Sequence, residues 1–186
     1  MSKKTLVVLT VGSELASQLL NGISLHQLAL GEAKSFSNSI GAEFIEVDSK
    51  ALLETLKVKD FDQVVIHDEL RPLVSQAQLQ RTFEALGDFD AVRPTLAFTE
   101  TIKAIDENQR LNQTIDREKV RRISSPEVIR KSAIDFQGQI NTWSVPLKTG
   151  AQISQIESEP QGIRVNNLPE LKMLAALAQL SDLPQK

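Results

Sequence analysis

Runs of apolar residues and helical repeats of apolar residues alternate along the first part of the chain. Residues 5–11, 42–47 and 61–67 are short runs built around Val, Ile, Leu and Phe, a pattern typical of buried strands. Between them, apolar residues recur every three or four positions over residues 25–40 and 50–56, which predicts two helices. Strands that alternate with helices favour a parallel sheet with right-handed crossover connections.

Turn-forming and capping residues mark the ends of these elements. A short helical stretch at residues 14–20 is expected to end at Asn21-Gly22, because both residues tolerate a positive φ. Residues 76–86 follow a serine N-cap and repeat apolar positions at helical spacing, which predicts a further helix. The strand expected at residues 90–98 contains Pro94, which has no backbone donor, so an edge or bulged position is expected.

The pattern changes at residue 99. Polar and apolar residues alternate over residues 99–106 and 111–117, with a polar turn between them, which predicts a β-hairpin closed by a loop. An isolated hairpin is marginally stable in water, so this arm needs support. The hairpin could be supported by a second copy of the chain or by the domain of its own chain, and the sequence leaves both alternatives open.

Four more elements are expected after the hairpin. Ser124-Ser125-Pro126 predicts the start of a helix through residue 132, because serine caps and a proline in the first turn are typical of helix starts. Residues 151–157 and 162–165 are read as short strands. A last helix begins near Asn167, and its leucines are expected to lie in the core.

One stretch places charged side chains at an expected strand end. His67, Asp68 and Arg71 follow the apolar residues of the third strand. Ligands of parallel α/β sheets bind at the carboxyl ends of strands, so Asp68 and Arg71 are candidates for binding a polyanion or a metal. The alternative is structural, with Asp68 capping a turn and Arg71 pairing with it.

Composition narrows the classes of protein to consider. The 186 residues suit one domain, and a net charge of -3 with a pI near 5.5 argues against a protein that binds nucleic acid or a membrane surface. There are no cysteines and two histidines, so any metal would be held by oxygen ligands. Residues 5–11 are read as a strand rather than a signal peptide, and no stretch approaches the length of a membrane span, so a cytoplasmic protein is expected.

Five motifs occur in a familiar order and spacing. They are His67-Asp68-x-x-Arg71-Pro72, Thr101-Ile102-Lys103, Thr114-Ile115-Asp116-Arg117, Ser125-Pro126, and Gly162-Ile163-Arg164-Val165 followed by Pro169-Glu170-Leu171. Over about residues 61–180 this pattern resembles the 2-C-methyl-D-erythritol 4-phosphate cytidylyltransferase family, which uses CTP in the non-mevalonate route to isoprenoids.

The resemblance implies a Rossmann-like, glycosyltransferase-A-like α/β nucleotidyltransferase fold with a mixed, mostly parallel sheet flanked by helices. Residues 1–186 would form one domain, and residues 99–118 would form a protruding β-hairpin arm through which a homodimer assembles. CTP and a sugar-alcohol phosphate would be the substrates, with Mg²⁺ as the cofactor. The implied site residues are Arg164 as the catalytic residue, Asp68, Arg71, Thr101, Lys103 and Arg117 for the sugar phosphate, Gly12 for the nucleotide, and Asp68 for the metal.

The chain departs from the family pattern at its start. The family has a glycine-rich loop with an arginine and a lysine for the CTP phosphates, whereas here Val11-Gly12-Ser13-Glu14 follows the first strand and no arginine precedes Arg71. Glu69-Leu70 replaces a pair of alanines. A cluster of cations around one cleft is nevertheless expected from Arg71, Lys103, Arg117, Arg121, Arg122 and Arg164.

These observations lead to two hypotheses about function, an enzyme and a binding or regulatory protein. A third hypothesis differs from the first only in the substrate. The chain is either a cytidylyltransferase that forms its site in a dimer, or a catalytically degenerate family member that binds a sugar phosphate or has a regulatory role. A nucleotidyltransferase with another substrate is the variant.

Overall fold

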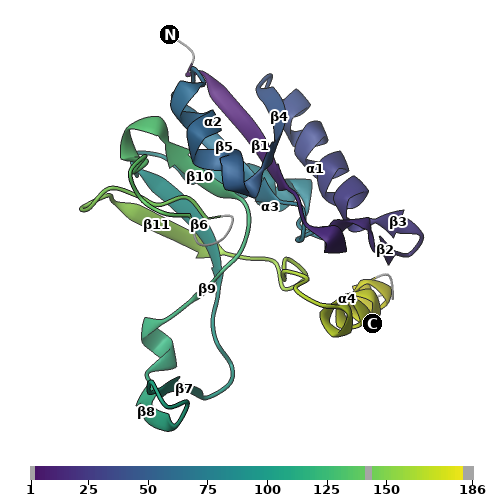
Figure 1. Cartoon of the computed structure of the whole chain (residues 1–186). Helices are drawn as coiled ribbons and strands as arrows, with labels where there is room; N and C mark the ends of the chain where they lie inside the picture. Colours follow the sequence, from purple (N-terminus) through teal and green to yellow (C-terminus); the bar gives the residue numbers. More distant parts are fainter. Residues whose placement is uncertain (1–2, 141–143, 182–186) are drawn as a thin grey trace.

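The computed structural model describes residues 3–140 and 144–181 (Figure 1). The strands are β1 (Thr5–Val11), β2 (Leu19–Leu20), β3 (Ile23–Ser24), β4 (Glu43–Asp48), β5 (Gln63–Asp68), β6 (Ala91–Leu96), β7 (Ile102–Ile105), β8 (Leu111–Ile115), β9 (Arg122–Ile123), β10 (Glu127–Arg130) and β11 (Ile153–Glu157). The α-helices are α1 (Leu25–Ser39), α2 (Leu52–Val58), α3 (Gln76–Glu84) and α4 (Leu168–Ser181). Short 3₁₀ helices cover Glu14–Ser17, Ser49–Ala51, Arg117–Lys119 and Lys131–Ala133.

A mixed sheet in the order β11-β6-β10-β5-β1-β4 forms the centre of the molecule. β1 pairs in parallel with both β4 and β5, and β11 pairs in parallel with β6, whereas β10 runs antiparallel to its two neighbours. The predicted mostly parallel, mixed sheet is therefore confirmed. Parallel pairing brings the carboxyl ends of β1, β4 and β5 to one edge of the sheet, with Thr10 opposite Asp68 and Val11 opposite Asp48.

Alternate residues of the central strands pack into two separate cores. Leu6 and Val8 of β1 face the side covered by α2, where Leu52 and Leu56 are fully buried. Val7 faces the opposite side, where α1 and α3 meet through an edge-to-face contact between Phe36 and Phe83, with ring centroids 5.8 Å apart. Burial on both faces explains why these strands are continuous apolar runs.

The expected edge position of the strand with Pro94 is wrong, because β6 lies between β11 and β10. The backbone of Pro94 faces the gap between β9 and β10: its carbonyl accepts a hydrogen bond from the Ser124 amide there. The antiparallel pairing of β6 is interrupted between β10 and β9. Because no strand residue there needs the backbone donor that proline lacks, Pro94 removes no hydrogen bond of the sheet.

The predicted helix at residues 124–132 is also wrong. Residues 127–130 form strand β10, and a 3₁₀ turn follows. The two serines do not cap a helix: the Ser124 hydroxyl donates to the Gly162 carbonyl, and the Ser125 hydroxyl bonds to the His67 ring. Val128 and Ile129 are fully buried between β5 and β6, and this tertiary pairing overrides the local capping signal.

Three smaller expectations need correction. Residues 14–20 form a 3₁₀ turn and then strand β2, and Asn21-Gly22 is the two-residue turn of a β2–β3 hairpin, with φ values of 52° and 85°. Residues 162–165 form a loop instead of a strand. In α4, Leu171 and Leu174 are buried as predicted, whereas Leu177 is 40% exposed.

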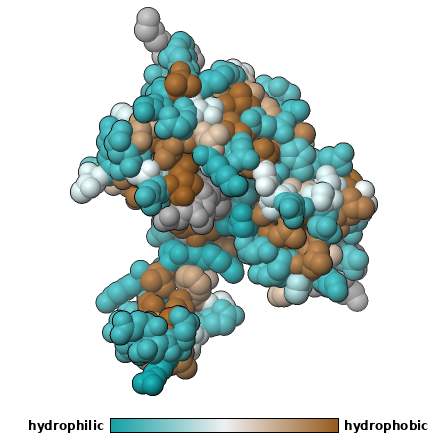
Figure 2. Space-filling model, viewed as in Figure 1, coloured by the Kyte–Doolittle hydropathy of each residue, from teal (hydrophilic) through white to brown (hydrophobic). Residues whose placement is uncertain are grey.

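The predicted hairpin is confirmed as β7 and β8, which form a two-stranded sheet of their own. Figure 1 shows this arm projecting away from the central sheet, and Figure 2 shows it as a separate lobe with apolar patches on its surface. Ile105 and Leu111 on the arm are 55% and 75% exposed. Within the described residues, no helix is long and apolar enough to cross a membrane.

Candidate functional site

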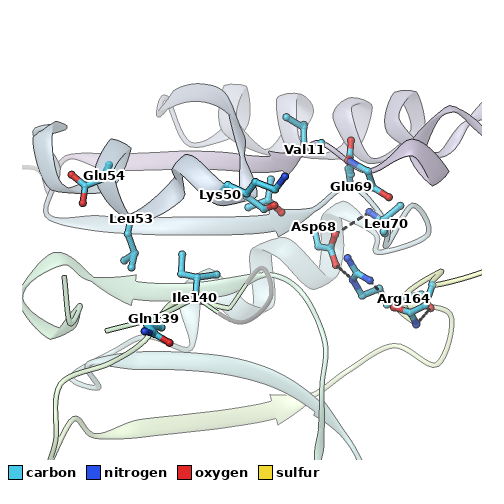
Figure 3. Close-up of a pocket in the computed structure, with 15 residues that line it drawn as sticks. Val11, Lys50, Leu53, Glu54, Asp68, Glu69, Leu70, Gln139, Ile140 and Arg164 are labelled. Carbon is cyan, nitrogen blue, oxygen red and sulfur yellow. Dashed lines mark hydrogen bonds and ion pairs between the residues drawn. The ribbon is translucent and has the colours of Figure 1, made fainter. Parts of the chain in front are cut away.

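A cleft of about 940 Å³ opens at the carboxyl ends of β1, β4 and β5 (Figure 3). Its lining residues are Thr10, Val11, Gly12, Ser13, Ser49, Lys50, Leu53, Glu54, Asp68, Glu69, Leu70, Gln139, Ile140, Arg164 and Asn166. Figure 3 shows Leu53 and Ile140 toward one end, and Asp68, Glu69 and Arg164 toward the other. Glu54 and Gln139 lie beside these two apolar side chains, so that end of the cleft is mixed, whereas the other end, here called the charged end, carries Asp68, Glu69 and Arg164.

Asp68 is the fixed point of the charged end. Its carboxylate is almost fully buried, and one oxygen accepts a hydrogen bond from the Leu70 amide at 3.1 Å. The other oxygen pairs with Arg164, 2.7 Å from its Nε. Asp68 thus does cap the turn after β5, as the structural alternative expected, and it also holds a partly exposed arginine at the wall of the cleft.

Arg164 lies on the loop after β11, a segment that the sequence wrongly placed in a strand. The loop is attached to the strand end by a 2.8 Å bond from the Val165 amide to the Leu70 carbonyl. A second contact of the guanidinium, 2.6 Å from its Nη1 to the Asn166 side chain, fixes its orientation. About a third of the Arg164 side chain stays exposed, so the charge can reach a ligand.

Arg71 does not line the cleft. Its guanidinium donates to the carbonyls of Gly162 and Ile123, at 2.7 and 2.9 Å, and its Nε lies 3.7 Å from Asp68. Burial lowers the pKa of Arg71 to about 10, and the nearby charge of Arg164 acts in the same direction. Arg71 remains charged at neutral pH and joins the loop that carries Arg164 to the end of β5.

His67 points away from the cleft into the body of the protein. Its ring is fully buried and its Nδ1 lies 2.7 Å from the Ser125 hydroxyl, which also accepts from the Asp68 amide. Burial lowers the pKa of His67 to about 3, so the imidazole is neutral at physiological pH. His67 therefore fixes the end of β5 from behind.

The loop after β1, which contains Gly12 and Ser13, has two carboxylates close to it. Gly12 has a φ of +115°, and a Cβ at this position would lie 2.8 Å from an oxygen of Asp48, so the glycine is required by the approach of that side chain. The next amide, of Ser13, donates to the carboxylate of Glu69 at 2.8 Å. The Glu69 side chain is buried and lies 3.1 Å from Nδ1 of His26.

Of the six cations expected around one cleft, Arg164 lines the cleft of its own chain. Among the described lining residues, the basic side chains are Lys50 and Arg164. On the arm, Lys103 donates to Thr114 and Arg117 donates to the Thr99 carbonyl. Thr101, Lys103 and Arg117 thus lie on the projecting arm and do not line the cleft of their own chain.

Lys50 and His26 are residues of this site that sequence reasoning missed. Lys50 lies in the 3₁₀ helix Ser49–Ala51 that follows β4, and its position near a carboxyl strand end was the available signal. Within the described part of the chain it has no ion-pair partner. His26 lies in the first turn of α1, and no sequence signal connects it to Glu69, which is 43 residues away.

The described residues contain no group of three or more His, Cys, Asp or Glu side chains arranged to hold a metal ion. Asp68 is the acidic residue of the charged end closest to Arg164, and its oxygens already accept from the chain itself. Mg²⁺ commonly binds through one or two carboxylates together with substrate phosphates. Asp68 fits such a shared arrangement, and it does not fit a metal site built from protein groups alone.

Comparisons with known proteins point to one family. Residues 5–142 match the sequence model of the family described as 2-C-methyl-D-erythritol 4-phosphate cytidylyltransferase. A bifunctional enzyme IspD/IspF of Nitrobacter winogradskyi is 40% identical over 78 residues, which are 42% of this chain and 20% of that protein. A 2-C-methyl-D-erythritol 4-phosphate cytidylyltransferase of Acidobacterium capsulatum is 25% identical over 135 residues, 66% of this chain and 56% of its own length. The matches to these curated relatives thus span only part of each relative.

Solved structures show the same fold. A 4-diphosphocytidyl-2C-methyl-D-erythritol synthase from Anaerococcus prevotii superposes with a TM-score of 0.76 at 16% identity, covering 95% of this chain and 99% of that one. The cytidylyltransferase from Thermus thermophilus gives a TM-score of 0.73 at 18% identity, covering 93% and 98%. The Rossmann-like nucleotidyltransferase fold expected from the motifs is confirmed.

Proposed function

Because the chain belongs to the 2-C-methyl-D-erythritol 4-phosphate cytidylyltransferase family, we propose that it transfers CMP from CTP to 2-C-methyl-D-erythritol 4-phosphate in isoprenoid biosynthesis. In this reaction an acceptor phosphate oxygen bonds to the α-phosphorus of CTP, the bond to the bridging oxygen breaks, and pyrophosphate leaves. The single observation that carries the proposal is the ion pair of Asp68 and Arg164 at the carboxyl end of β5, inside the cleft.

Arg164 is the catalytic residue of this proposal. Transfer between two anionic substrates depends on positioning them and on stabilising negative charge in the transition state. Asp68 and Asn166 hold the guanidinium in one orientation, so little reorganisation is needed when a phosphate arrives. Arg71 acts as a positioning residue, since its buried guanidinium braces the loop that carries Arg164.

A divalent metal accompanies nucleotides in this proposal, and Asp68 is the residue of the chain that would hold Mg²⁺ together with phosphate oxygens. The ion would offset phosphate charge during transfer. Gly12 and Lys50 border the part of the cleft that remains for the nucleotide.

The arm is proposed to complete the site of a second copy. We infer that residues 1–186 form one nucleotidyltransferase-like unit and that residues 99–118 mediate a homodimer, with Thr101, Lys103 and Arg117 reaching the partner's sugar phosphate. Exposed Ile105 and Leu111, on a hairpin that pairs only with itself within the described residues, support this assignment. Deletion of residues 101–115 should then give a monomer in sedimentation velocity, and an unchanged profile would contradict the arm's role.

A second candidate function has its own supporting observation. The Ser13 amide already donates its hydrogen bond to Glu69. Arg164 and Lys50 are the basic residues among the described residues that line the cleft. A catalytically degenerate member that binds a sugar phosphate, or acts as a regulatory dimer, would keep the strand-end charges and tolerate this carboxylate.

One experiment separates the two functions. Pyrophosphate release is measured with CTP, Mg²⁺ and methylerythritol phosphate, and binding of each substrate alone is measured by calorimetry. Turnover that is lost in Arg164→Ala and retained in Lys57→Ala, a change on an exposed face of α2, supports transfer. Binding of the sugar phosphate without any turnover favours the degenerate member, and absence of both rejects the two proposals together.

A further inference from the structure

Gln78 is a buried polar residue of α3 to which the proposed reaction assigns no role. Its side chain is fully buried, whereas Gln80, two positions further along the helix, bonds to Glu84 at the surface. Gln78 is not one of the described residues that line the cleft. Because a buried amide is costly unless its donors and acceptors are satisfied, the partners of Gln78 indicate what this side chain holds in place.

The side-chain amide of Gln78 joins two segments that are far apart in the chain. Its nitrogen donates to the carbonyl of Ser125, and its oxygen accepts from the backbone amide of Glu159. The same oxygen lies 3.3 Å from the hydroxyl of Ser158, which is also buried. Gln78 therefore connects the segment before β10 with the segment after β11.

These two segments lead to the two partners of the ion pair in the cleft. The hydroxyl of Ser125 accepts from the backbone amide of Asp68 at 3.2 Å, so this segment holds the end of β5 that carries the carboxylate. Glu159 begins the loop that carries Arg164. Gln78 thus bonds to the residue behind Asp68 on one side and to the loop of Arg164 on the other.

The loop of Arg164 has further anchors on both sides of the arginine. The amide of the next residue donates to the Leu70 carbonyl at 2.8 Å, and Arg71 donates to the Gly162 carbonyl at 2.7 Å. Replacing Arg71 would remove a charge beside the ion pair together with an anchor. Gln78 is uncharged and lies outside the cleft, so a change there affects the anchoring alone.

We propose that Gln78 is a positioning residue: by bonding to both segments, it sets the orientation of the Arg164 guanidinium relative to Asp68. Without these bonds, the start of the loop can shift relative to the end of β5. A small displacement of a charged donor lowers the stabilisation that it gives to a transition state. The expected effect on the reaction rate rests on the proposed function, whereas the effect on the orientation of Arg164 does not.

The test variant is Gln78→Met, because methionine keeps an unbranched side chain of similar length and removes both hydrogen bonds. Gln80→Met makes the same change on an outer face of the same helix and is the matched control. Thr82→Val is the control for stability. The buried Thr82 hydroxyl donates to the backbone carbonyl of Gln78 within α3, so its loss weakens the helix without removing a bond to the loop.

The first measurement follows the Arg164 guanidinium directly by NMR. The Nε–H signal of Arg164 is assigned by its absence in Arg164→Lys, and its exchange with solvent is measured in the full chain and in each variant. The contact with Asp68 protects this proton. We expect exchange to be roughly tenfold faster in Gln78→Met and unchanged in the two controls. Unchanged exchange in Gln78→Met, or an equal acceleration in Thr82→Val, would overturn the proposal.

The second measurement is steady-state pyrophosphate release with CTP, Mg²⁺ and methylerythritol phosphate. Gln78→Met should lower kcat roughly tenfold and change the KM of either substrate less than about twofold, because a misoriented donor loses more in the transition state than in the ground state. Thr82→Val should lower the Tm and leave kcat unchanged at temperatures well below it. In a chain that turns over, an unchanged kcat in Gln78→Met would overturn the proposal.

A second variant covers a failure of Gln78→Met to fold. Gln78→Asn keeps a polar amide but is one methylene shorter, so it cannot reach both partners, and the same changes in exchange and kcat are expected. If the unmodified chain shows no turnover, the proposed function fails, and the exchange of the Arg164 proton by itself confirms or overturns this inference. The two failures are thereby distinguished.

Discussion

At the strand end of the cleft a carboxylate is paired with arginines, whereas at the loop end carboxylates are held by an amide and an imidazole. Asp68 pairs with Arg164 and Arg71, and the result is an oriented cation at the cleft wall. Glu69 is held by Ser13 and His26, and the result is an oriented anion a short distance away. The strand end thus presents a cation to the cleft, and the loop end presents carboxylates.

This difference shows that one cleft can hold an oriented cation at one side and oriented carboxylates at the other. The strand-end residues are joined by buried bonds that also hold the fold together, since Arg71 links three segments of the chain. The loop end is held by fewer contacts, namely the approach of Asp48 to Gly12 and the bond from the Ser13 amide to Glu69. Three predictions follow, each directed at one side of the comparison.

The largest effect is expected from loss of the strand-end cation. Arg164→Ala should lower the rate of CMP transfer by on the order of 10²–10³-fold, the usual cost of removing one preorganised donor to a transition state. Arg164→Lys should recover only part of the rate, because an ammonium cannot reproduce the two directed contacts of the guanidinium. Steady-state pyrophosphate release measures both. An unchanged rate in Arg164→Ala would show that the strand end is not where charge is stabilised.

A smaller effect concerns the buried imidazole behind the strand end. The folded-state pKa of His67, about 3, lies below its ordinary value of 6.5, so its contribution to stability is complete above pH 6.5 and is lost as pH falls toward 3. Between pH 6.5 and 5 the free energy of unfolding should fall by about 2 kcal/mol from this group alone. Urea unfolding at several pH values measures the change.

A histidine variant isolates that effect. His67→Gln cannot titrate at this position and should flatten the dependence of stability on pH over this window, even though it is less stable at pH 7. The same slope in His67→Gln and in the unmodified chain would show that the strand end does not depend on a neutral His67.

The smallest effect is expected from Lys50, a cation of the cleft near the loop of Gly12 and Ser13. Lys50→Ala should weaken binding of tripolyphosphate by roughly threefold, because an exposed charge contributes only about 0.2–1 kcal/mol. Lys57→Ala, on an exposed part of α2 outside the cleft, is the control and should leave the affinity unchanged. Calorimetry at low salt measures the change. A loss as large as that of Arg164→Ala would mean that the two ends contribute equally to anion binding.

The N-terminal elements could be predicted because local and tertiary preferences agree there. Residues 5–11 are apolar on both sides of the strand, and both sides are buried. Ser24 forms a complete capping box with Gln27 at the start of α1, as its sequence position suggested. In both cases the contacts that decide the structure lie within the element or follow from its pattern of apolar residues.

The errors occur where a distant segment decides. Ser124 and Ser125 bear the signature of a helix start, but their hydroxyls bond to residues that are 38 and 58 positions away. Pro94 is accepted inside the sheet because two other strands leave a gap beside it. Distant segments also decide the contacts of Arg71, whose guanidinium donates to the backbone carbonyls of Ile123 in β9 and of Gly162 in the loop after β11.

The sequence by itself determined the family, the mixed sheet with its flanking helices, the projecting hairpin, and Asp68 as the end point of the central strand. These follow from apolar periodicity and from motifs whose order survives without knowledge of contacts. Only the tertiary structure decided that Arg164 is held by Asp68, that His67 faces away from the cleft, and that Glu69 is fixed by His26. The physical reason is that charge and hydrogen-bond satisfaction in a buried site depend on partners far apart in the chain, which the local pattern of residues does not record.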